Sequence, residues 1–161
     1  MSINCKTVIK NQLVNRLALI GFAVLSQLIF ITPVQALTQD FQWTGLRGFS
    51  ARGTLSYDEN IATKIIAEKG SGETRQLESL KINFYSPDNE LMAQYHDVVD
   101  GVSLKDYFEL KFDTIQHQFI GEIDLGGETP GELFLTGRVG EQLSLVKIEP
   151  SGEEHTIDSD R

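Results

Sequence analysis

The chain has 161 residues, with 14 basic and 23 acidic side chains, a formal net charge of −9 at pH 7, and one cysteine, Cys5. Its first 36 residues hold Lys6, Lys10 and Arg16 but no acidic residue, so the remaining 125 residues carry a net charge of −12. Such a surface repels nucleic acids and anionic lipids, which argues against a polyanion partner. Because no cysteine follows Cys5, the rest of the chain must be stabilised by a hydrophobic core without disulfides.

Residues 1–36 have the pattern of an export signal. The three basic residues precede an apolar run from Leu17 to Ile31, and Val34-Gln35-Ala36 provides the small residues that signal peptidase accepts. We expect cleavage after Ala36, an extracytoplasmic location (periplasmic or secreted), and no stable membrane anchor after cleavage. The alternative is a retained anchor, although the run is shorter than the ~20 residues that span a bilayer comfortably.

Residues 41–58 alternate with a period of two, which is typical of a strand with one wet face. As one straight strand they would extend about 59 Å, whereas a domain of this size has a radius of gyration of only about 14 Å. We therefore expect a bend or a break at each glycine of the stretch. These are Gly45, Gly48 and Gly53.

The next segment is ambiguous and the later ones are clear. Ile61, Ile65 and Ile66 fit either a short helix or a strand, and residues 69–73 have loop composition. Alternation then predicts strands over 77–84, 91–99, 107–112, 119–125, 133–139 and 143–148, with turns at residues 87–89, 100–101, 113–117 and 140–141. The expected inward sets are Leu80, Ile82 and Phe84 on one strand and Phe108, Leu110 and Phe112 on another.

These segments predict an all-β domain over residues 37–150. About seven or eight antiparallel strands would form a meander that closes as a barrel or folds as a two-sheet sandwich, with at most one short helix. Residues 151–161 are expected to form an acidic tail, with a short edge strand around residues 155–157.

Catalytic and metal-binding patterns are weak. No Gly-x-Ser-x-Gly motif occurs, and His96, His117 and His155 have no ligand spacing, so we expect them to be solvated. Asp97, Asp100 and Asp113 flank turns that could meet at one end of a meander and bind calcium. No Asp-x-Asp-x-Asp-Gly loop supports that site, and we expect no other cofactor.

Aromatic residues are the remaining candidates for binding. Tyr85 and Tyr107 alternate with the inward Phe84 and Phe108, so they face outward, and Trp43 is the one tryptophan. Exposed aromatics on a sheet can bind a sugar, a small ligand or a protein partner. Ordinary packing at sheet edges is the alternative for the same residues.

The sequence resembles a group of uncharacterised exported bacterial β-domain proteins, of the type found in cyanobacteria. The similar motifs are Gly53-Thr54-Leu55-Ser56-Tyr57-Asp58, Phe84-Tyr85-Ser86-Pro87-Asp88 and Phe112-Asp113-Thr114, within residues 41–148. Some of those proteins carry a PEP-CTERM sorting tail, which is missing from residues 157–161. The resemblance implies an exported β-domain of unassigned activity, without anchoring by that tail.

Three functions remain open from the sequence. The first is a non-catalytic binding or interaction module, because no catalytic constellation is visible. The second is a carrier with an apolar cavity inside a barrel, although the bulky inward residues favour a filled core. The third is a hydrolase that uses two carboxylates on end loops, for which they must lie within about 10 Å in a cleft.

Overall fold

A computed structural model describes residues 36–161, so the predicted signal peptide lies outside the described residues except for Ala36. The described part of the chain is all-β and has no helix, which confirms the predicted all-β class. It has thirteen strands rather than seven or eight, because several are very short, and their order in sheet A is not that of a simple meander. No helix within it is long and apolar enough to cross a membrane. The strands are β1 Ala36–Thr44, β2 Ser50–Asp58, β3 Ile65–Lys69, β4 Gly72–Glu73, β5 Leu77–Tyr85, β6 Leu91–Val99, β7 Val102–Ser103, β8 Glu109–Asp113, β9 Gln118–Phe119, β10 Glu122–Gly126, β11 Leu133–Arg138, β12 Gln142–Ile148 and β13 Glu154–Ser159.

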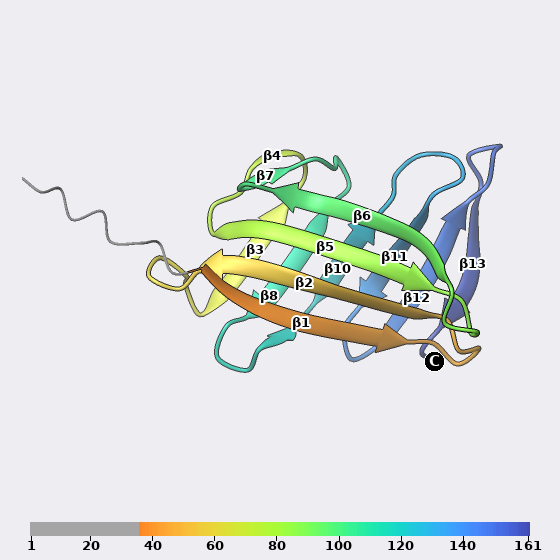
Figure 1. Cartoon of the computed structure of the whole chain (residues 1–161), viewed down its shortest axis with the longest axis horizontal. Helices are drawn as coiled ribbons and strands as arrows, with labels where there is room; N and C mark the ends of the chain where they lie inside the picture. Colours follow the sequence, from red (N-terminus) through yellow and green to blue (C-terminus); the bar gives the residue numbers. More distant parts are fainter. Residues whose placement is uncertain (1–35) are drawn as a thin grey trace, which may run out of the picture. The chain divides into compact units, whose positions relative to one another are not determined.

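The strands form two antiparallel sheets stacked as a sandwich (Figure 1). Sheet A has the order β1-β2-β5-β6-β7-β4 and sheet B the order β13-β12-β11-β10-β8-β3, with β9 paired to β8. Figure 1 shows the strands of sheet A in front, with those of sheet B crossing behind them. The sheets do not close into a barrel, so the sandwich is the correct one of the two predicted architectures.

The core lies between the sheets and is filled by the predicted inward residues. Leu80, Ile82 and Phe84 of sheet A are fully buried, and Leu110 and Phe112 face them from sheet B. Burying each such side chain contributes roughly 1.5–3 kcal/mol relative to leaving it exposed. The period-two alternation therefore identified the core correctly.

The predicted break in residues 41–58 occurs at two glycines and not at the third. The chain turns between Gly45 and Gly48, whose positive φ of 91° favours glycine. Gly53 lies inside the continuous strand β2, so the chain does not break there. A Cβ at this position would overlap the ring of Phe41 and the carbonyl of Lys81. Gly53 is needed because the Phe41 side chain of the neighbouring strand packs over it.

In the middle of the chain the structure settles one open prediction and corrects two others. Residues 65–69 form β3, so the strand alternative is correct and Ile61 is exposed in a turn. The predicted loop 69–73 is wrong in part, because Gly72–Glu73 is β4 and pairs with β7. The predicted strand 119–125 is interrupted at Gly121, which has a φ of 66°. A residue in that conformation cannot continue the ladder.

The predicted C-terminal tail is part of sheet B. Its strand β13 pairs with β12 and buries Asp158, whose carboxylate accepts the N–H groups of Arg47 (3.0 Å) and Phe49 (3.2 Å) in the β1–β2 turn. Because residues 151–161 are acidic, the sequence predicted a tail whose carboxylates are in contact with water. The carboxylate is buried here because backbone donors from the opposite sheet satisfy it.

Candidate functional site

The three aromatic residues singled out from the sequence do not share a site. Trp43 faces the interior and is 8 % exposed. Tyr85 lies on the outer face of sheet A, with the guanidinium of Arg52 4.7 Å from its ring centre. Tyr107 is 73 % exposed in the loop before β8. Trp43 borders a large apolar cleft and Tyr107 borders a smaller one.

An apolar cleft of about 280 Å³ lies between β1 and sheet B. Phe41 and Trp43 form its wall on sheet A, and Phe119, Val139 and Leu143 are among its apolar residues on the other side. The rings of Phe41 and Phe119 make an edge-to-face contact with centres 4.8 Å apart. This volume is close to the lower end of the roughly 300–1,000 Å³ of small-molecule sites.

The cleft combines a polar rim with one buried donor that has no acceptor. Gln42, His117 and Gln118 are exposed residues that also line it. The indole Nε1 of Trp43 is buried without a hydrogen-bond partner among residues 36–161. An unpaired buried donor costs about 1–3 kcal/mol. Because Nε1 has almost no accessible surface, this unpaired donor is a cost to the fold and not an open contact of the cleft.

A second, smaller cleft of about 170 Å³ contains carboxylates. Asp124, Glu128 and Glu154 line it together with Tyr107 and Phe134. Burial raises the pKa of Asp124 to about 6, and Glu128 and Glu154 add to the rise. The hydroxyl of Thr136 opposes it by donating to Asp124 Oδ2 (3.3 Å). A carboxyl whose pKa is raised toward neutral pH is better suited to act as a general acid than one with an ordinary pKa.

Asp97 is the most deeply buried acidic group in the described part of the chain. It is 0 % exposed, and its Oδ2 accepts the N–H of Gly126 (2.9 Å), which joins β6 to β10 across the sandwich. Its Oδ1 has no partner within residues 36–161. Burial raises the pKa of Asp97 to about 7, against the opposing effects of the Gly126 bond and Lys105.

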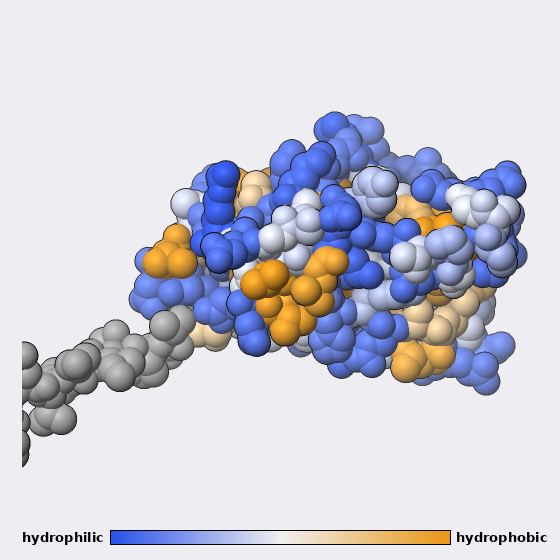
Figure 2. Space-filling model, turned by 90° about the horizontal axis from the view of Figure 1, so that it is seen from above, coloured by the Kyte–Doolittle hydropathy of each residue, from blue (hydrophilic) through white to orange (hydrophobic). Residues whose placement is uncertain are grey.

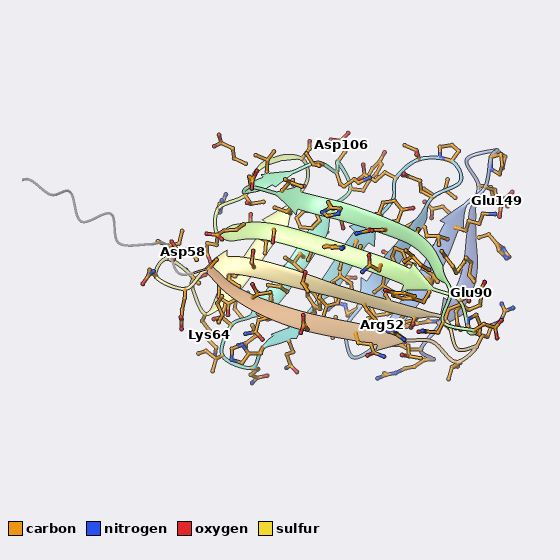
Figure 3. The ribbon with its side chains drawn as sticks, in the orientation of Figure 1. Arg52, Asp58, Lys64, Glu90, Asp106 and Glu149 are labelled. Carbon is orange, nitrogen blue, oxygen red and sulfur yellow. The ribbon has the colours of Figure 1, made fainter. Side chains whose placement is uncertain are left out.

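The predicted calcium ligands are not brought together. Asp97 is in the core, Asp100 is in the β6–β7 turn, and Asp113 accepts the N–H groups of Ile115 and Gln116 in its own turn. No group of three or more His, Cys, Asp or Glu residues in the described chain could hold a metal ion. Figure 3 shows the labelled Asp58 and Lys64 at one end of the sandwich and Glu90 and Glu149 at the other.

The histidines are exposed, as expected. His96 lies on β6, His117 in the β8–β9 turn and His155 on β13, and each is on the surface. His96 and Asp97 point to opposite faces of their strand, so they do not form a dyad. Of the three, only His117 lines a cleft.

Comparisons of the chain with protein-family models, with curated proteins and with solved structures give no match. The site is therefore interpreted from its geometry and chemistry.

The sequence analysis missed most of the apolar cleft. Phe119, Val139 and Leu143 are alternating apolar residues like any others, and the alternation does not tell which ones border an open space. The position of β1 at the edge of sheet A creates that space, and strand order cannot be derived from alternation alone. The signal that could have been used is Trp43, the single tryptophan at an inward position of the first strand.

Proposed function

We propose that this protein is an exported, non-catalytic binding module whose site is the apolar cleft beside β1. The observation that carries the proposal is a cleft of about 280 Å³ whose walls are mainly apolar, with Phe41 and Trp43 on one side, and whose rim is polar. Such a site suits an uncharged apolar group that carries one acceptor, for example a carbonyl oxygen. Export is proposed from the basic and apolar pattern of residues 1–36. No cofactor is part of the proposal.

The expected occupant of the cleft is neutral. Residues 37–161 carry 23 acidic and 11 basic side chains, and neither a lysine nor an arginine lines the cleft. A carboxylate ligand would therefore lose its hydration without gaining a cation. This argument favours a carbonyl, ether or hydroxyl compound over a fatty acid.

A Val139→Trp substitution should block the cleft. The probe is 6-propionyl-2-(dimethylamino)naphthalene, a neutral fluorophore with one carbonyl. Because Trp43 is the only tryptophan, energy transfer from it to the probe reports binding to the protein, and the substitution at Val139 tests whether the cleft is the place. A larger side chain at Val139 occupies the same space, so we expect affinity to fall about tenfold or more, measured by the probe's own fluorescence.

The matched control is Ile115→Trp, which adds the same bulk at a side chain that is 67 % exposed in a turn. It should leave probe binding unchanged. Absence of energy transfer in the wild-type protein, or equal binding by the two variants, would refute the assignment of the cleft as the site.

A second candidate function is a carboxylate-based hydrolase at the smaller cleft, which the raised pKa of Asp124 beside Glu128 favours. In that case Asp124→Asn removes hydrolysis of chromogenic nitrophenyl esters or glycosides. Glu122→Gln is the matched control, because Glu122 lies on the same strand but binds Arg138 outside this cleft. Equal rates for the two variants and the wild type would exclude this candidate.

A further inference from the structure

Strand β1 is an edge strand with free backbone groups. Within residues 36–161 it pairs only with β2, in continuous register from Ala36↔Asp58 to Thr44↔Ser50. One step beyond that register, the N–H of Gly45 donates to the carbonyl of Phe49. Bonded and non-bonded pairs alternate along an antiparallel ladder. The odd residues of β1 therefore bond to β2, and the even residues direct their N–H and C=O groups to the free edge.

This edge lacks the features that usually prevent a further strand from adding. Proteins protect edges with lysine, proline, bulges or very short strands. Strand β1 has nine residues, contains neither lysine nor proline, and pairs without a bulge. The other edges differ: β4 has two residues, β3 contains Lys69, and the β12–β13 ladder has a register shift.

The inner side of β1 is incompletely covered. Leu37 and Phe41 point toward the core but are only partly buried, unlike the fully buried inward residues of β2 and β5. The apolar cleft begins at Phe41 and Trp43 on the same strand. Inward side chains of a strand added beside β1 would lie over this cleft. The free backbone and the cleft are thus parts of one surface.

We propose that the natural ligand is an extended segment of a partner protein, which adds to β1 as a strand and places an apolar side chain in the cleft. This inference rests on the proposed function, because it uses the same cleft. Main-chain hydrogen bonds supply affinity in strand addition, and pockets for alternate side chains supply specificity.

Charge indicates which segment fits. Asp40 is the only charged residue of β1, and its exposed side chain lies on the outer face. A lysine or arginine directly opposite it would be favourable. A basic segment is also attracted to a domain with a net charge of −12 over residues 37–161. A second copy of this chain brings the same negative charge and is disfavoured. We therefore expect alternating apolar and basic or polar residues.

The test uses a display library of random nonapeptides selected against the wild-type protein. Asp40→Pro removes one free-edge N–H but none of the bonds to β2, and proline is tolerated on edge strands. Asp40→Asn is the matched control that removes the same charge and keeps the N–H. We expect the selected peptides to alternate apolar with basic or polar residues. They should bind Asp40→Pro about tenfold more weakly than Asp40→Asn. Val139→Trp should weaken them as well.

Each other outcome overturns the inference. The inference is wrong if no peptide is enriched, or if the peptides bind Asp40→Pro and Asp40→Asn equally. A wild-type dimer in gel filtration that Asp40→Pro dissociates would make a second copy the occupant. The naphthalene probe separates the two proposals, because it should bind Asp40→Pro as it binds the wild type. Probe binding without edge-dependent peptides leaves the cleft function standing and removes the strand partner.

Discussion

Replacement of Asp97 by asparagine is expected to stabilise the protein at pH 8. At that pH the wild-type carboxyl must ionise at a position with 0 % exposure, where, among residues 36–161, Oδ1 has no partner and Gly126 is the single donor to Oδ2. The introduced amide keeps the acceptor for Gly126 without the buried charge. We expect a gain of about 1–3 kcal/mol, since part of the benefit is offset by the amide's unpaired donors.

The same substitution should flatten the pH dependence of stability. The pKa of Asp97 is about 7 in the folded protein and about 3.9 in an unfolded chain. Between these values the folded state binds the proton and the unfolded state does not, so stability falls as pH rises. The contribution of the protonated Asp97 to the free energy of unfolding is fully present below pH ~3.9 and is lost as the pH rises through ~7. Its upper limit is about 4 kcal/mol.

Urea unfolding from pH 4 to pH 8 measures both effects. Asp40→Asn is the control, because it removes the same charge from an exposed side chain and should leave the curve unchanged. Asp124→Asn should flatten the curve over a narrower range, since the pKa of Asp124 is about 6. A steep wild-type curve that persists in Asp97→Asn would contradict the assignment.

Replacement of Asp158 by alanine is expected to destabilise the protein strongly. The carboxylate is 3 % exposed and accepts the N–H groups of Arg47, Phe49 and Ser159. Its removal leaves donors of the β1–β2 turn unpaired, although Leu46 N–H and the Arg47 side chain still donate to carbonyl groups of β13. Hydrogen bonds to charged groups contribute about 1.5–3 kcal/mol each, so we expect a loss of about 2–5 kcal/mol.

Thermal unfolding tests this expectation. A loss of this size should lower the melting temperature by about 10 °C or more for a domain of this length. Asp158→Asn retains one acceptor oxygen and should have an intermediate effect. Glu153→Ala removes an exposed carboxylate from the β12–β13 turn and serves as the control. Equal melting temperatures for Asp158→Ala and Glu153→Ala would show that the bonds to the turn contribute nothing.

Local patterns predicted the core of this protein well. Phe84 and Phe112 alternate with polar neighbours, and the structure buries both between the sheets. Alternation works in this fold because one face of each strand is exposed to solvent and the other faces the core. The sequence of a strand therefore shows which of its side chains point inward. The role of Gly53 could not be predicted from it, because the Phe41 side chain that overlies Gly53 comes from a neighbouring strand.

The burial of Asp97 and the cleft beside β1 depend on contacts between strands, which the sequence of a single strand does not show. The buried state of Asp97 follows from the proximity of β6 and β10, which belong to different sheets. The cleft follows from the edge position of β1. Neither can be obtained from periodicity, since the order of strands in a sheet is set by long-range packing. Trp43 was selected from the sequence as a candidate for an exposed aromatic, whereas the structure gives it an inward position.

Figure 2 shows that one face of the molecule is mainly hydrophilic, with separate apolar groups rather than one broad apolar area. Several strongly exposed apolar side chains lie in turns or loops, among them Leu46, Leu104 and Ile115. Isolated exposed residues of this kind are normal on soluble proteins. They support a localised site better than a flat apolar docking face.

The bond between Asp158 and the β1–β2 turn also has a consequence for how the chain matures. The two partners are 111 residues apart, so the first hairpin cannot reach its final contacts until nearly all of the chain is available. During synthesis the N-terminal strands form while their partner is still missing. Such distant contacts slow folding. A domain with this contact completes its structure only once β13 is available to the first hairpin.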